Sequence, residues 1–150
     1  MDMFSNKRLW CVFVVMILPA IIAGCGEDGT TGALEPLSDE PMILESVTCL
    51  DIDEGRPAGI TDTFLSSDDE IYIWAYWTNI EDTYTIDAVW FKPGEDYAYE
   101  EDSQTISSST GFKITWFALN KPPGGFARGN WSVDIYVDDA FERSHLFAVK

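Results

Sequence analysis

The chain has 150 residues, of which 26 are acidic and nine are basic, and its formal net charge is −17. Such a charge excludes nucleic acid and anionic membrane surfaces as partners bound by electrostatic attraction. The length allows one domain with its own hydrophobic core once any N-terminal targeting segment is set aside.

The first 24 residues have the order of a targeting segment. Lys7 and Arg8 precede an apolar run of 15 residues, Leu9 to Ala23, which contains Pro19. A membrane-spanning helix needs about 20 apolar residues, whereas the apolar region of a signal peptide needs only about 7–15. Length and charge order therefore predict that residues 1–24 are a signal peptide, removed from the mature protein.

The segment Ile22-Ala23-Gly24-Cys25 resembles the lipobox of bacterial lipoproteins. The resemblance implies that a peptidase cuts between Gly24 and Cys25, and that Cys25 carries a diacylglyceryl group and an N-acyl chain such as palmitate. Two or more acyl chains hold a protein stably at a membrane. An uncleaved anchor and an ordinary secretory signal are the alternatives. Gly26, not Asp, follows the cysteine, which by the enterobacterial sorting rule points to the outer membrane of a Gram-negative cell.

Residues 25–41 are rich in Gly, Thr, Pro and acidic residues and lack an apolar period, which predicts a lipidated flexible tether. Patterned sequence begins at Met42, so we expect the folded domain to span residues 42–150. With Cys11 in the signal and Cys25 lipidated, Cys49 is the remaining thiol, and no internal disulfide can form. We expect Cys49 to be a buried small hydrophobe, with an intermolecular disulfide or a reactive thiol as the alternatives.

Beyond Met42 the chain alternates between short apolar runs and turn residues, and no stretch sustains helical spacing of apolar residues. A break is expected at Gly55–Gly59, and Tyr97–Ile106 is polar enough to form a sheet edge. The expected strands are 43–52, 70–77, 84–91, 97–106, 112–119, 131–137 and 141–149, with a weaker candidate at 60–65. This pattern predicts an all-β fold, an antiparallel β-sandwich of about seven strands.

Several strands have one apolar side, which predicts that one face of each strand supplies the core and the other faces water. The apolar sides are Ile86, Ala88 and Trp90; Phe112, Ile114 and Trp116; and Trp131, Val133, Ile135 and Val137.

Two turns fit the final hairpin, a two-residue turn at Asp138-Asp139 and a three-residue loop through Ala140. The loop pairs Trp131 with Phe147 and matches apolar side chains across the two strands, so it is preferred.

The entry Gly129-Asn130-Trp131, the strand that follows it and the final Phe147-Ala148-Val149 resemble the closing hairpin of bacterial immunoglobulin-like domains. The resemblance covers about 30 residues and implies an immunoglobulin-like sandwich. The cysteine pair of antibody domains is absent, so the likeness is to the architecture. Folds of this type host many functions, and the fold alone therefore does not name an activity.

No set of catalytic or metal-binding residues can be assembled from the sequence. His145 is the only histidine, and the preferred hairpin register places it and Arg143 near a rim or a bulge. One thiol and one imidazole cannot form a zinc site alone. Asp51–Gly55 begins like an EF-hand loop but has Arg56 where that loop requires glycine. The other carboxylate-rich loops, 67–70 and 100–102, are interpreted as solvated, with calcium binding as the alternative. We therefore predict neither a cofactor nor a metal, and no enzyme activity.

Trp74 and Trp77 lie on opposite sides of one expected strand, so they cannot both point into the same layer. One of them is expected to be exposed, and the two are the candidate ligand-facing aromatic residues. The sequence thus predicts a membrane-anchored, non-catalytic binding or assembly module of the bacterial cell envelope, with envelope proteins or glycans as partners. The alternative is a carbohydrate-binding accessory lipoprotein that uses exposed aromatic residues.

Overall fold

The computed structural model describes residues 39–150 of the chain. The lipobox-like segment, with Gly24 and Cys25, and most of the expected tether lie outside these residues. Within residues 39–150, no helix is long and apolar enough to cross a membrane.

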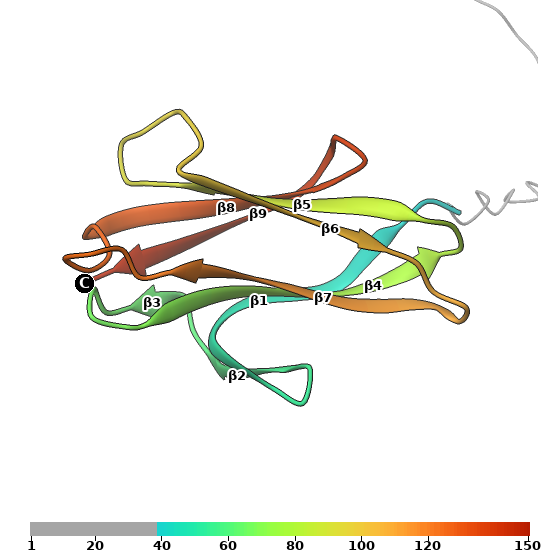
Figure 1. The fold of residues 1–150 in the computed structure, drawn as a ribbon, viewed down its shortest axis with the longest axis horizontal. Helices are drawn as coiled ribbons and strands as arrows, with labels where there is room; N and C mark the ends of the chain where they lie inside the picture. The colour runs from blue at the N-terminus through green and yellow to red at the C-terminus, as the bar shows by residue number, and fades with distance from the viewer. Residues whose placement is uncertain (1–38) are drawn as a thin grey trace, which may run out of the picture. The chain divides into compact units, whose positions relative to one another are not determined.

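The domain is an all-β sandwich of two sheets, as the sequence predicts (Figure 1). Sheet I has the strand order β2-β1-β4-β7 and sheet II the order β3-β9-β8-β5-β6. All pairings are antiparallel except the short pairing of β3 with the end of β9. The strands in residues 39–150 are β1 (Met42–Asp53), β2 (Arg56–Ile60), β3 (Thr63–Phe64), β4 (Glu70–Ile80), β5 (Tyr84–Phe91), β6 (Glu100–Ile106), β7 (Gly111–Asn120), β8 (Gly129–Val137) and β9 (Ala140–Val149).

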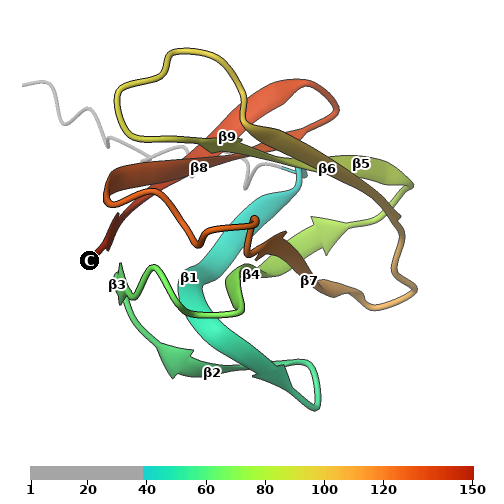
Figure 2. The same cartoon turned by 60° about the vertical axis from the view of Figure 1, so that its left-hand side comes forward.

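The strand count exceeds the prediction because the expected break at Gly55–Gly59 is mostly strand. Only Glu54 and Gly55 form the turn, with φ angles of 48° and 77°, and β2 begins at Arg56. Two successive residues with positive φ make the tight turn that joins antiparallel strands. Pro57 is tolerated because β2 is an edge strand. Figure 2 shows the β1–β2 hairpin projecting from sheet I.

The core lies between the two sheets and is built from one side of each long strand. Ile86, Ala88 and Trp90 of β5 are buried in it, as their alternation predicts. Trp131 of β8 stacks on Phe147 of β9 with ring centroids 6.2 Å apart. Aromatic side chains of this size let a small domain without disulfides bury a large apolar area.

The prediction for β7 is wrong about which side faces the core. Thr115, Phe117 and Leu119 are buried, whereas Phe112 and Trp116 are 48% and 41% exposed. Both sides of this strand are apolar, so alternation alone cannot choose between them. Pairing with β4 decides the side, because the buried residues of β7 lie opposite the core-facing residues of β4.

The final hairpin combines features of both expected turns. Asp138 and Asp139 form a two-residue turn with φ angles of 46° and 68°, so the expected three-residue loop is wrong. A β-bulge after the turn then shifts the register by one residue and pairs Trp131 with Phe147, as predicted. A bulge adds one residue to one strand, which gives the apolar register that the turn alone does not. Arg143 lies directly after this bulge, in line with the expected rim or bulge position.

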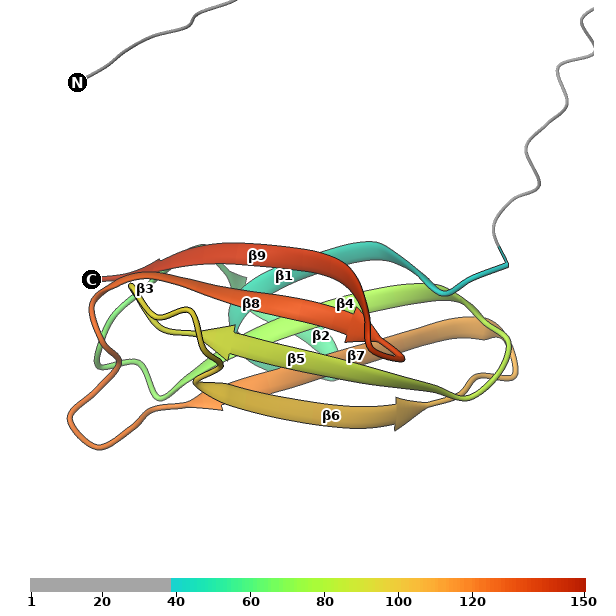
Figure 3. The same ribbon diagram turned by 90° about the horizontal axis from the view of Figure 1, so that it is seen from above.

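Polar β6 forms the outer edge of sheet II, as the sequence predicts. It lies beside β7, the edge of sheet I, and Figure 3 shows the two strands next to each other along one side of the sandwich. The side chains of this open edge therefore come from both sheets.

Candidate functional site

The two tryptophans singled out in the sequence lie on opposite faces of β4, as expected, but neither is freely exposed. Trp77 is 0% exposed in the core, and its indole Nε1 donates a hydrogen bond to Thr115 Oγ1 at 2.9 Å. Its assignment as a ligand-facing residue is therefore wrong, because core packing covers the whole ring. Trp74 lies on the outer face of sheet I but is only 6% exposed. Its Nε1 donates to the carbonyl oxygen of Gly55 at 2.9 Å, in the turn of the β1–β2 hairpin.

Trp74 is instead the inner end of a row of aromatic side chains on the outer face of sheet I. Its ring stacks with that of Tyr76 at 6.5 Å between centroids, and Tyr76 stacks with Phe112 at 5.9 Å. Trp116 lies opposite Trp74 across the β4–β7 pair. We call Trp74, Tyr76, Phe112 and Trp116 the aromatic strip. A search for isolated exposed tryptophans misses the strip. Its signal in the sequence is that residues 112–119 carry large apolar side chains on both sides of the expected strand.

On β4 and β7, the central part of this outer face carries no charged side chain, although Glu45 of the neighbouring β1 lies opposite Tyr76. From Tyr72 to Tyr76 on β4 and from Phe112 to Ala118 on β7, the outward positions are aromatic, aliphatic or small. Glu70 lies at the margin, where its carboxylate accepts a hydrogen bond from the Tyr72 hydroxyl at 2.5 Å. This bond, together with burial, raises the pKa of Tyr72 to about 12, so the hydroxyl stays protonated at neutral pH.

A hollow of about 420 Å³ lies at one end of the strip, between the edges of the two sheets. We call it the edge groove. Tyr72, Trp116, Phe117 and Ala118 contribute from sheet I, and Asp102, Ser103 and Gln104 contribute from β6. The side-chain nitrogen of Gln104 donates to the backbone oxygen of Trp116 at 2.6 Å, which ties the two edges together.

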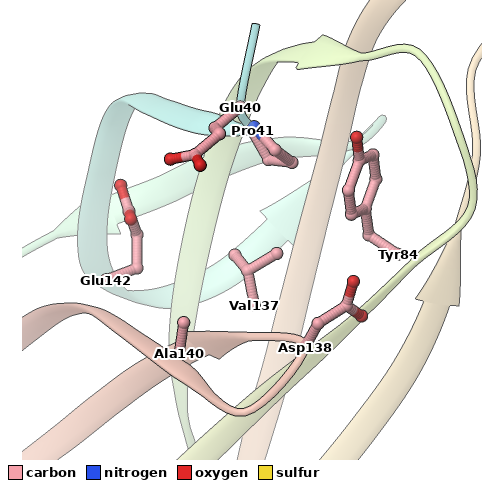
Figure 4. Close-up of a pocket in the computed structure, with 7 residues that line it drawn as sticks. All are labelled: Glu40, Pro41, Tyr84, Val137, Asp138, Ala140 and Glu142. Carbon is pink, nitrogen blue, oxygen red and sulfur yellow. The ribbon is translucent and has the colours of Figure 1, made fainter. Parts of the chain in front are cut away.

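A second hollow, of about 270 Å³, lies beside the β8–β9 turn (Figure 4). Carboxylates of Glu40, Asp138 and Glu142 surround it, together with the ring of Tyr84. Asp138 has a structural role, because its carboxylate accepts a hydrogen bond from the backbone N–H of Thr85 at 2.8 Å. Across residues 39–150, no three Asp, Glu, His or Cys side chains converge to hold a metal ion.

His145 belongs to a polar cluster that joins the two sheets. Its Nε2 lies 2.8 Å from the hydroxyl oxygen of Ser46, and Arg143 Nη1 donates to the same oxygen at 3.1 Å. Arg143 Nη2 also donates to the backbone oxygen of Ile43 at 3.2 Å. Burial lowers the pKa of His145, and the nearby Arg143 charge lowers it further. A Ser–His pair needs a carboxylate to orient the imidazole, whereas the charged neighbour of this pair is a guanidinium.

Of the two carboxylate-rich loops that the sequence offered as calcium candidates, residues 100–102 are the start of strand β6, and residues 67–70 are held by ordinary contacts. A carboxylate oxygen of Asp68 accepts from the backbone N–H of Leu65 at 2.8 Å. Asp69 pairs with Lys121 at 2.5 Å, and this partner lowers the pKa of its carboxyl group. Cys49 is a buried free thiol, as expected, and burial raises its pKa and disfavours the reactive thiolate.

Comparison with known proteins bears on the fold. No protein-family model matches the sequence, and the search of curated proteins finds no match. Among solved structures, an immunoglobulin-like protein from Pseudomonas aeruginosa matches with a TM-score of 0.50 and 10% sequence identity. The match covers 74% of this chain and 97% of that protein. Together with the sheet order described above, this likeness identifies residues 39–150 as an immunoglobulin-like β-sandwich domain.

Proposed function

We propose that this chain is a membrane-anchored, non-catalytic binding module of the bacterial cell envelope, which uses the aromatic strip as its binding surface. The anchor is the lipid on Cys25, which the likeness of residues 22–25 to a lipobox supports. The strip is the observation that carries the binding role. Phe112 and Trp116 are large aromatic residues that the fold leaves 48% and 41% exposed although their strand has a second, buried apolar side.

Phe141 and Tyr97 are exposed as well, so it is the contiguity of its stacked rings that distinguishes the strip. Contiguous exposed apolar patches on a soluble domain mark sites of interaction, and Trp and Tyr are enriched among residues that dominate binding energy. A β-sheet face also supplies a rigid support, so little side-chain entropy is lost when a partner binds. These features favour a protein partner of the envelope that covers the outer face of sheet I.

A second candidate, a carbohydrate-binding accessory lipoprotein, is favoured by one observation. Trp116 borders the edge groove, where hydrogen-bonding side chains lie beside an exposed indole.

The non-catalytic part of the proposal draws support from His145, whose neighbours are Ser46 and Arg143 and not the acid that general-base catalysis uses.

The anchor is tested by the Cys25→Ser variant of the full chain, expressed in its source cell. We expect the variant to remain an uncleaved precursor or to leave the membrane fraction, because the thiol that accepts the lipid is gone. Fractionation and gel migration against wild type measure this. A variant that is cleaved and stays at the membrane like wild type contradicts lipid anchoring.

The binding surface is tested by placing a photo-crosslinking amino acid at Phe112, with Phe141 as the matched control. Both side chains are exposed phenylalanines that contact one tyrosine ring, Tyr76 and Tyr136 respectively. We expect an envelope protein to be crosslinked from position 112 and not from position 141. Equal yields from both positions, or no product from position 112, contradict the strip as the binding surface.

A further inference from the structure

The edge groove is a cleft with one wall from each of the two sheets. β6 of sheet II faces the edge of sheet I, and Asp102 and Gln104 lie on the same side of β6 as Ile106, which is buried. They lie opposite the core residues Ala88 and Ile86 of β5, and so they project toward the other sheet. Polar residues thus occupy inward positions at the point where the core ends and the groove begins.

The groove is ordered by hydrogen bonds before any ligand enters. Gln104 is tied to the backbone of Trp116 at 2.6 Å, and the Tyr72 hydroxyl is held by Glu70 at 2.5 Å. The Trp116 ring lies on the outer face with 41% of its surface exposed. A volume of about 420 Å³ is within the range of small-molecule sites, roughly 300–1,000 Å³.

The lining offers both hydrogen-bond donors and acceptors beside an apolar ring. Asp102 supplies an acceptor, and the Gln104 amide keeps a free oxygen and a second N–H. Sugar hydroxyls also donate and accept, and a pyranose ring presents an apolar C–H face that can stack on an indole. A cation interacts only with lone-pair acceptors, so it would use Asp102 and leave the N–H donor of Gln104 without a role.

Charge excludes the acidic classes of ligand. None of the residues that line the groove is a cation, and Asp102 lies beside Glu100 and Glu101 on β6. Phosphates, nucleic acids and uronic acids carry negative charge that this site would repel. The pKa of Glu100 is raised, first by burial and then by the charge of Asp102.

We propose that the edge groove binds a neutral oligosaccharide, with the indole of Trp116 stacked on a sugar ring and with Asp102 and Gln104 hydrogen-bonded to its hydroxyls. The inference rests on the second candidate of the proposed function, carbohydrate binding, for which it names the site and the ligand class. The aromatic strip extends from the groove along β4 and β7, so adjoining sugar units would lie over Tyr76.

The test is calorimetric titration of the full mature protein, held in a detergent without a sugar headgroup. The probes are neutral hexasaccharides of glucose, mannose, galactose and N-acetylglucosamine, with a hexagalacturonate as the acidic comparison. We expect at least one neutral probe to bind at up to millimolar concentration, to change tryptophan fluorescence and to bind equally well in high salt. The acidic probe is expected not to bind.

Variants assign the binding to the groove. Trp116→Ala is expected to weaken affinity by about tenfold or more, as loss of a central aromatic contact does. Trp116→Phe should restore part of the loss, and Asp102→Asn should also weaken binding. Phe141→Ala is the matched control, because it removes an exposed ring on sheet II that neither lines the groove nor belongs to the aromatic strip.

Three results would overturn the inference: no neutral probe binds, binding is abolished by salt, or Trp116→Ala binds like wild type while remaining folded by circular dichroism. If the probes fail but a protein is still crosslinked from position 112, only the ligand class is wrong. If both experiments fail, the proposed binding function fails with it.

Discussion

The outer faces of the two sheets differ in a way that their shared architecture does not require. On sheet II, Asp87 lies opposite Tyr136 and Val89 lies opposite Asp134, so acidic and apolar side chains are mixed. On sheet I, Trp74 lies opposite Trp116, and Tyr76 lies opposite Ile114. Sheet II follows the usual rule for a solvated antiparallel face, whereas the β4–β7 part of sheet I breaks it. In a chain with 26 acidic residues, an aromatic surface on β4 and β7 without a charged side chain of its own is the feature that needs a functional explanation.

The largest effect is expected from comparing a core tryptophan with a strip tryptophan. Trp77→Ala should lower the free energy of unfolding by about 3–5 kcal/mol, because it leaves a cavity and a buried Thr115 hydroxyl without its partner. Trp116→Ala should cost less, about 1–2 kcal/mol, because 41% of its surface is already exposed and its removal leaves no enclosed cavity. Urea unfolding followed by circular dichroism measures both. Equal losses would mean that the strip is part of the structural core.

A smaller effect should separate the two outer faces directly. Phe112→Asp places a charge in the aromatic strip, and Phe141→Asp places one beside Tyr136 on sheet II. Both side chains are exposed, so each change should alter the free energy of unfolding by about 1 kcal/mol or less. Only Phe112→Asp should reduce the binding of a hydrophobic fluorescent dye such as ANS. The same reduction in both variants would remove the distinction between the faces.

The smallest effect is expected between the sheets, where pH acts on His145 and leaves the aromatic strip unchanged. Burial and Arg143 lower the pKa of His145 from 6.5 in the folded state, while Ser46 faces it from β1. The unfolded chain therefore takes up a proton at higher pH than the folded chain does. Stability should fall as pH drops through 6.5 and should level off below the folded pKa.

His145→Gln isolates this contribution, since glutamine can still hydrogen-bond to Ser46 but does not titrate. The difference in melting temperature between wild type and variant should narrow as pH falls below 6.5. Dye binding to the strip should be the same above and below that pH. A constant difference in melting temperature at all pH values would show that His145 titrates alike in both states.

Much of the fold is predictable because strands and turns are local features of the sequence. Residues 84–91 form β5 with the expected side buried, since Thr85 and Asp87 mark the other side as solvent-facing. The polar edge strand and the pairing of Trp131 with Phe147 are confirmed as well. The turn at Asp138-Asp139 was predicted with the wrong length, because a bulge later in the strand can compensate for a shorter turn.

Less of the candidate site than of the fold could be predicted from the sequence. Trp74 and Trp77 were separated correctly onto two faces by the period of the strand. That period does not reveal that the β1–β2 hairpin covers Trp74, or that the exposed rings are those of Phe112 and Trp116. The groove was not foreseeable at all, because Gln104 and Trp116 meet only through the contact of two edge strands.

The sequence by itself determined the all-β class and the positions of most strands. It also determined which side faces the core in those strands whose other side carries polar residues. These properties depend on neighbours along the chain. Only the tertiary structure decided which apolar side of β7 faces the core, because that choice follows from its register against β4. The same holds for the edge groove, whose walls come from two sheets, and for the aromatic strip, which is the apolar surface that remains once the core is filled.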